Sequence, residues 1–149
     1  MRHLIIAGSE KSGTTSVYHY LNAHPDVVGS YRKETDYFRR EGALSLEGYS
    51  RVFPPAQSKA MRMEASPGYL AESERVAPAI ASLLPDARLL FILRDPIERV
   101  LSSFQFHKSR LFIPEDMLFE DYVNLCLRYD KGEIDAQEAG IDDWFLQVL

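Results

Sequence analysis

Residues 4–16, Leu-Ile-Ile-Ala-Gly-Ser-Glu-Lys-Ser-Gly-Thr-Thr-Ser, decide the fold class of this chain. The apolar run at residues 4–7 is typical of a buried strand, and the polar stretch from Ser9 to Gly13 predicts a loop. From Thr14 to Asn22 apolar side chains recur at helical spacing, so we expect a helix there. A glycine-bounded loop between a strand and a helix lets backbone N–H groups converge on one point, where an anion can bind.

The rest of the chain continues the alternation of strands and helices. The helix before residue 84 is expected to begin near Pro78, because proline is tolerated in a first turn. The sequence therefore predicts an α/β fold with a P-loop-like parallel sheet flanked by helices, and we expect residues 1–149 to form a single domain. Strands are predicted at residues 27–28, 61–64 and 88–93, and helices at residues 46–53, 78–84 and 117–129 and after Asp95.

The composition is that of an ordinary globular protein. Hydrophobic residues make up 46% of the chain, and the net charge of −5 argues against nucleic acid as a partner. Cys126 is the single cysteine and lies in an apolar stretch of helical spacing, so we expect a buried structural thiol. The run at residues 4–7 is too short for a signal peptide or a membrane span, which favours a cytoplasmic protein without a membrane partner.

The loop carries donors that suit a phosphate. Lys11 supplies a point charge, and the Ser and Thr side chains at positions 14–16 add hydroxyl donors at the helix N-terminus. Nucleoside-triphosphate loops place the lysine directly after the second glycine and follow it with a Ser or Thr for magnesium. Here Lys11 comes two residues before Gly13, so the order fits a kinase poorly, although a P-loop small-molecule or nucleoside kinase stays open as an alternative.

A second candidate anion site follows the strand at residues 88–93. Arg94 stands at the carboxyl end of that strand, where open α/β sheets bind ligands, and Ser102 falls in the second turn of the next helix. An arginine and a hydroxyl can hold a phosphate from two sides. Asp95 is a suitable N-cap, and Glu98 three residues later predicts a reciprocal capping box. Taken alone, these residues fit a capped surface helix better than a ligand site.

The two sites in combination resemble a known family. Residues 11–16 resemble the 5′-phosphosulfate loop of sulfotransferases that use 3′-phosphoadenosine 5′-phosphosulfate (PAPS), and the segment from Arg94 to Ser102 resembles their 3′-phosphate motif. Glu10 departs from the family pattern, in which this position is usually proline or a small or neutral residue. An acid beside an anion site is unfavourable unless it points outward or pairs with a cation. The resemblance implies that the 5′-phosphosulfate is bound by Lys11, Ser12, Gly13, Thr14, Thr15 and Ser16, and the 3′-phosphate by Arg94 and Ser102.

Two further segments narrow the resemblance. Residues 33–38, Lys-Glu-Thr-Asp-Tyr-Phe, and residues 64–69, Glu-Ala-Ser-Pro-Gly-Tyr, resemble segments of glycosaminoglycan (heparan sulfate)-type sulfotransferases and their bacterial relatives. In that group the glutamate that matches Glu34 is the catalytic base, and the lysine that matches Lys33 lies near the transferring group. Should Glu34 not be the base, His107 is the next candidate.

The resemblance implies sulfuryl transfer from PAPS to a hydroxyl or amine of an acceptor such as a carbohydrate, with 3′-phosphoadenosine 5′-phosphate (PAP) as product. Lys11 would stabilise the leaving oxygen and Glu34 would accept the proton, without a metal. Family members continue beyond the apolar end at residues 144–149, so we expect the N-terminal portion of a sulfotransferase, lacking a lid and inactive alone. A non-catalytic nucleotide-binding fragment stays open as a second alternative.

Overall fold

The computed structural model describes residues 2–42, 44–55 and 61–147, which belong to two compact units. Met1–Leu93 is the first unit and Arg94–Leu149 is the second. The expected single domain over residues 1–149 stays a prediction. No helix within the described ranges is long and apolar enough to cross a lipid bilayer.

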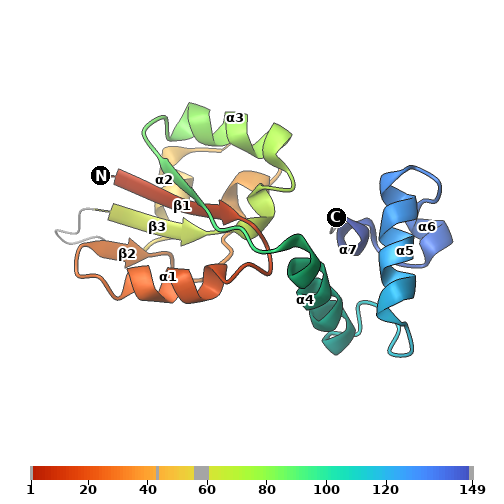
Figure 1. The fold of residues 1–149 in the computed structure, drawn as a ribbon. Coiled ribbons are helices and arrows are strands. Elements are labelled where there is room, and N and C mark those ends of the chain that lie inside the picture. The colour runs from red at the N-terminus through yellow and green to blue at the C-terminus, as the bar shows by residue number, and fades with distance from the viewer. Residues whose placement is uncertain (1, 43, 56–60, 148–149) are drawn as a thin grey trace. The chain divides into compact units, whose positions relative to one another are not determined.

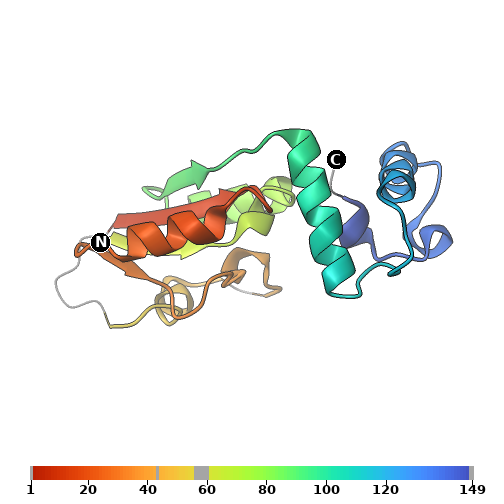
Figure 2. The ribbon, with the colours of Figure 1, turned by 60° about the horizontal axis from the view of Figure 1, so that its bottom comes forward.

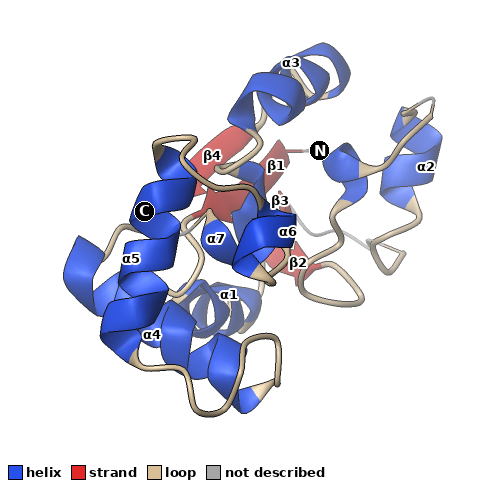
Figure 3. Cartoon of the chain, turned by 90° about the vertical axis from the view of Figure 1, so that its right-hand side faces the viewer, coloured by secondary structure: helices blue, strands red, loops and turns tan. Residues whose placement is uncertain are grey.

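The first unit is built on a parallel sheet of four strands (Figure 1). β1 lies inside the sheet, with Ile5 opposite Glu64 on one side and Leu89 on the other (Figure 3). The expected parallel sheet is confirmed with all its predicted strands, although the last strand ends at Phe91 rather than at Leu93. The strands are β1 (Arg2–Gly8), β2 (Val27–Gly29), β3 (Met61–Ala65) and β4 (Arg88–Phe91), in the spatial order β2-β3-β1-β4.

Helices cover both faces of this sheet. They are α1 (Thr14–Asn22), α2 (Leu46–Ser50) and α3 (Ser73–Leu83), with short 3-10 turns η1 (Tyr37–Arg39) and η2 (Pro67–Tyr69). The helix predicted at residues 14–22 is confirmed, and α2 is shorter than the helix predicted at residues 46–53. Figures 1 and 2 show α1 and α3 on opposite faces. Alternation along β1 explains this arrangement, since Ile5 packs on the α3 side and Ile6 on the α1 side.

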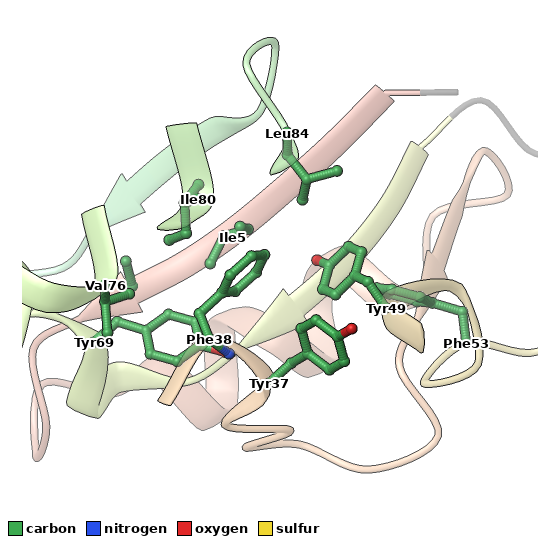
Figure 4. Packing of buried hydrophobic residues seen from close by; sticks show 10 residues of the cluster. Ile5, Tyr37, Phe38, Tyr49, Phe53, Tyr69, Val76, Ile80 and Leu84 are labelled. Carbon is green, nitrogen blue, oxygen red and sulfur yellow. The ribbon is translucent and has the colours of Figure 1, made fainter. Parts of the chain in front are cut away.

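The core cluster on the α3 side is rich in aromatic rings (Figure 4). Phe38 is 1% exposed and Tyr49 is fully buried, with their ring centroids 5.2 Å apart. Burial of each such side chain contributes about 1.5–3 kcal/mol. These rings fix the chain at residues 37–38 and 49–53 against Ile5 of β1, and residues 37–38 follow closely after the predicted base Glu34.

α3 begins at Ser73, so the expected start near Pro78 is wrong. The earlier start places Val76 and Ile80 one turn apart on the same face, and they are only 1% and 5% exposed. Burial of these two side chains offsets the hydrogen bond that Pro78 cannot donate. Pro78 itself faces solvent, where its ring is tolerated.

The second unit consists of helices around a core of its own. The predicted burial of Cys126 is confirmed, and burial raises the pKa of its thiol to about 11. His107 is also buried, with its Nδ1 3.2 Å from the hydroxyl of Tyr122, so the structure makes this candidate base a core residue. The helices are α4 (Pro96–Ser109), α5 (Phe119–Asp130), α6 (Ala136–Ala139) and α7 (Asp143–Leu146), of which α4 and α5 confirm predicted helices.

Candidate anion-binding and catalytic site

The loop after β1 is held against the chain after β4 by hydrogen bonds. Ser9 N donates to Ile92 O at 2.8 Å, and Ile92 N donates to Gly8 O at 2.7 Å, so the parallel pairing continues past the strands. Ser9 Oγ lies 2.7 Å from Ser12 Oγ and donates to Ile92 O at 3.3 Å. These bonds fix the loop that contains Lys11 at the carboxyl edge of the sheet, where α/β folds bind ligands.

The backbone leaves the N-terminus of α1 accessible to an anion. Lys11 and Gly13 have positive φ angles of 61° and 86°, and Gly13 is the N-cap residue of α1. Because glycine has no side chain, no cap competes for the N–H groups of residues 14–16, which carry the positive end of the helix dipole. A side chain accepts from a first-turn N–H in three other helices: Ser45 in α2, Asp95 in α4 and Asp135 in α6. α3 and α5 have no side-chain cap, as in α1, but α1 alone of these three follows a glycine-bounded loop that contains a lysine.

Replacing Gly13 with Ala is expected to weaken nucleotide binding and to lower stability by about 1–2 kcal/mol, because its φ of 86° disfavours a side chain. Gly140 is a matched control, since its φ is 66° and the space around it is equally open. Gly140→Ala should lower the melting temperature similarly without changing nucleotide affinity. Calorimetric titration and thermal unfolding measure the two effects, and an equal loss of affinity in both variants would contradict an anion site at Gly13.

The predicted catalytic pair lies beside the end of β3. Glu34 N donates to Ala65 O at 2.7 Å, which ties this segment to the last residue of the strand. Lys33 Nζ forms an ion pair with Glu34 Oε1. The side chain of Glu34 is 54% exposed, whereas that of Lys33 is 16% exposed. The structure therefore brings the two predicted residues together and leaves the carboxylate accessible.

Electrostatic interactions connect the loop after β1 with this pair. Burial raises the pKa of Glu10, and the neighbouring carboxylate of Glu34 raises it further. Arg39 and Lys33 oppose the rise, because nearby positive charge favours the ionised carboxylate. The pKa of Glu10 is raised on balance, so burial and the carboxylates of Glu34 and Asp36 outweigh the two cations. The loop and the Lys33–Glu34 pair belong to one charged cluster of the first unit.

The other predicted phosphate ligands, Arg94 and Ser102, belong to the second unit. Asp95 caps α4 as expected and accepts a hydrogen bond from Glu98 N at 3.1 Å. The second half of the expected capping box is wrong, because Glu98 Oε2 accepts from Arg94 Nε at 3.2 Å in place of the Asp95 amide. A guanidinium is a charged donor and competes well against a neutral amide. Ser102 lies in the second turn of α4, as predicted.

Glu64 is a functional candidate that was not among the predicted site residues. Its side chain is fully buried at the end of β3. Burial raises its pKa, although hydrogen bonds from Thr35, Ser66 and Tyr69 oppose the rise. An acid inside a buried parallel strand is costly unless it is well hydrogen-bonded. The glutamate within the strand predicted at residues 61–64 was therefore the signal in the sequence for a special role at this position.

Comparison with known proteins identifies relatives of this chain. The family model of the sulfotransferase domain matches residues 1–145. The membrane-associated sulfotransferase kil1 of Dictyostelium discoideum is 35% identical over 140 residues, which cover 85% of this chain and 30% of that protein. The human heparan sulfate glucosamine 3-O-sulfotransferase 3B1 is 34% identical over 103 residues, which cover 67% of this chain and 25% of that protein.

A solved structure shares the fold. The crystal structure of a sulfotransferase from Alicyclobacillus acidocaldarius matches with a TM-score of 0.75 and 21% identity, covering 99% of this chain and 63% of that chain. The two relatives named above are much longer, since this chain matches only 30% of kil1 and 25% of the 3-O-sulfotransferase 3B1. The match of the family model over residues 1–145 shows that the chain belongs to the sulfotransferase domain family.

Proposed function

We propose that this chain binds PAPS and takes part in sulfuryl transfer to a hydroxyl or amine of a carbohydrate. The observation that carries the proposal is the uncapped N-terminus of α1 after Lys11, in one charged cluster with the accessible carboxylate of Glu34. Transfer from a phosphorylated donor needs an anion site beside a base. Family membership supports the reaction, and relatives named for heparan sulfate support a carbohydrate acceptor.

Two sets of residues are proposed to bind the two ends of the donor. Amides and hydroxyls of residues 12–16 bind the 5′-phosphosulfate together with Lys11, and Ser102 and Arg94 bind the 3′-phosphate. The hydrogen bond from Arg94 Nε to Glu98 restricts the guanidinium, which lowers the entropy lost when it binds a phosphate. The support for Arg94 and Ser102 comes from the motif that they share with the family.

The proposed chemistry is an in-line transfer. Glu34 accepts the proton of the attacking hydroxyl or amine while the bond from that oxygen or nitrogen to sulfur forms. The bond from sulfur to the 5′-phosphate oxygen breaks, PAP leaves, and Lys11 with the loop amides stabilises the charge on that oxygen. Protonation of Glu34 removes its ion pair with Lys33, whose ammonium can then interact with the transferring group. No metal takes part in this scheme.

Transfer from radiolabelled PAPS to an unsulfated heparan-type polysaccharide tests the proposal. The full-length gene product is assayed, because the relatives are longer than the matched segment. We expect the label to be transferred to the polysaccharide, and no labelled product when a simple phenol replaces the polysaccharide as acceptor. Phosphate transfer from labelled ATP would instead identify a kinase. Tight PAPS binding without transfer to any acceptor would identify a nucleotide-binding protein that is not an enzyme.

Replacing Arg94 with Ala is expected to weaken PAP binding by about 1.5–3 kcal/mol, the usual range for a hydrogen bond to a charged group. Adenosine 5′-phosphosulfate lacks the 3′-phosphate, so its affinity should change much less. Arg99→Ala removes a charge from α4, the helix that follows Arg94, and is the control. Calorimetry measures each affinity. An equal loss for both nucleotides, or for both variants, would exclude Arg94 as the 3′-phosphate ligand.

A cytoplasmic location without membrane association is also part of the proposal. One relative, kil1, is named as a membrane-associated protein, so this point needs its own test. Cell fractionation followed by detection of the protein distinguishes the two outcomes, and recovery in the membrane fraction would overturn a cytoplasmic location.

A further inference from the structure

The buried carboxylate of Glu64 accepts hydrogen bonds from hydroxyl groups on several segments. Thr35 and Ser66 donate to Oε2, the latter at 3.1 Å. Tyr69 and Tyr49 donate to Oε1 at 3.3 Å and 3.4 Å. An ionised carboxylate only accepts hydrogen bonds, so it can receive all of these donors at once. Glu64 thus joins the end of β3 to the chain that follows Glu34.

Three of these hydroxyls also accept from consecutive backbone N–H groups just after Glu34. Each hydroxyl has a single hydrogen, and when it accepts from an N–H group that hydrogen can point to Glu64. The backbone after Glu34 is therefore bound to Glu64 through three parallel relays. The relays run from the N–H groups of Asp36, Tyr37 and Phe38 to Ser66 Oγ (3.1 Å), Thr35 Oγ1 (3.4 Å) and Tyr69 Oη (3.2 Å).

The backbone at Glu34 needs such support. Glu34 and Asp36 have positive φ angles of 62° and 47°, in the left-handed region that non-glycine residues adopt at a cost. Such a conformation persists only where surrounding contacts enforce it. The bond from Glu34 N to Ala65 O holds the segment on one side of Glu34, and the relays hold it on the other.

We propose that Glu64 is a positioning residue, which through Thr35, Ser66 and Tyr69 holds the backbone so that Glu34 faces the substrate. This inference rests on the proposed function, because it assigns Glu64 a task in the reaction whose base is Glu34. Glu64 is fully buried and acts through its neighbours, so it does not contact the substrate. Its removal should misdirect Glu34 and leave the donor site intact.

The test compares Thr35→Val, Thr35→Ser and Glu64→Gln in the full-length gene product. Valine keeps the shape of threonine but removes one relay, whereas serine keeps the hydroxyl. Glutamine places N–H donors where hydroxyl hydrogens point. We expect Thr35→Val and Glu64→Gln to lower kcat by about 10–10²-fold with the KM for PAPS unchanged, since misplacement of a reacting group by an ångström can cost this much. Thr35→Ser should restore most of the wild-type kcat.

Tyr122→Phe is the control for a general loss of stability. The buried hydroxyl of Tyr122 donates to Phe145 O at 2.7 Å in the second unit, so its removal also deletes a buried hydrogen bond. We expect Tyr122→Phe to lower the melting temperature without lowering kcat. If Thr35→Val keeps wild-type kcat, or if Tyr122→Phe lowers kcat equally, Glu64 is not a positioning residue.

Amide hydrogen exchange provides a readout that does not depend on activity. The N–H groups of Asp36, Tyr37 and Phe38 should be protected in the wild-type protein and exchange at least about tenfold faster in Glu64→Gln, since local opening sets protection. Unchanged exchange rates would show that the relays to Glu64 do not hold this backbone, even if turnover fell. If the wild-type protein transfers no sulfuryl group, the proposed function fails, while the exchange rates still decide whether Glu64 holds this backbone.

Discussion

Replacing Glu34 with Gln is expected to lower turnover by roughly 10²–10⁴-fold, the effect of losing a general base. Glutamine keeps the shape of the side chain but cannot accept the proton. Donor affinity should stay nearly unchanged, because the anion site is formed by the loop of residues 11–16. Single-turnover transfer from labelled PAPS measures the rate, and calorimetry with PAP measures the affinity, both in the full-length gene product.

Glu47→Gln is the matched control for Glu34→Gln. Glu47 is an exposed glutamate that pairs with Arg51, so its replacement removes the same charge from a residue with no role in the proposed reaction. Its turnover should equal that of the wild type. Near-normal turnover in Glu34→Gln would remove Glu34 from the catalytic role. Glu10 would then be the next candidate, because its carboxyl interacts with the same cluster and His107 is buried against Tyr122.

Replacing Lys11 with Ala is expected to lower both donor affinity and turnover, with turnover falling by about 10²–10³-fold. That range is typical when one donor to a developing oxyanion is removed. The positive φ of 61° at Lys11 is equally strained for lysine and for alanine, so Lys11→Ala removes the charge without changing the backbone preference. Lys11→Gly removes both the charge and the strain, so the two variants should lose similar activity if the charge is what matters.

Lys131→Ala provides the charge control for the Lys11 variants, since Lys131 is exposed at the end of α5 in the second unit. Its affinity and turnover should match those of the wild type. Binding of PAP that is unchanged in Lys11→Gly would show that Lys11 does not contact the 5′-phosphate. Wild-type turnover in Lys11→Gly would show that the charge of Lys11 is not needed for the transfer.

The sequence predicted those parts of the fold in which local signals and tertiary packing agree. The strand and helix on either side of the loop of residues 9–13 were predicted correctly. The spacing of the apolar residues, the glycines and the hydroxyl residues all indicate the same succession of strand, loop and helix. Pro78 shows the opposite case: burial of Val76 and Ile80 outweighs a local signal for a later helix start. Glu98 likewise follows a charged partner rather than the cap pattern.

The roles of the predicted site residues stay predictions, and the contacts that support Glu34 were not predicted. Lys33 and Glu34 were identified through resemblance. In the structure they form an ion pair, and the carboxylate of Glu34 is exposed, which a base that must reach a substrate requires. The relays to Glu64 could not be predicted, because they join residues that are about 30 positions apart and depend on hydroxyl directions. Periodicity and spacing contain no information about such contacts.

Calorimetric titration of the wild-type protein with PAP and with ATP, each with and without Mg²⁺, tests the central claim most directly. A site that binds a 5′-phosphosulfate through Lys11 and a 3′-phosphate through Arg94 should bind PAP more tightly than ATP, and Mg²⁺ should not reverse this order. ATP binding that equals or exceeds PAP binding, in particular when it depends on Mg²⁺, would contradict the assignment of this chain to PAPS-dependent sulfuryl transfer.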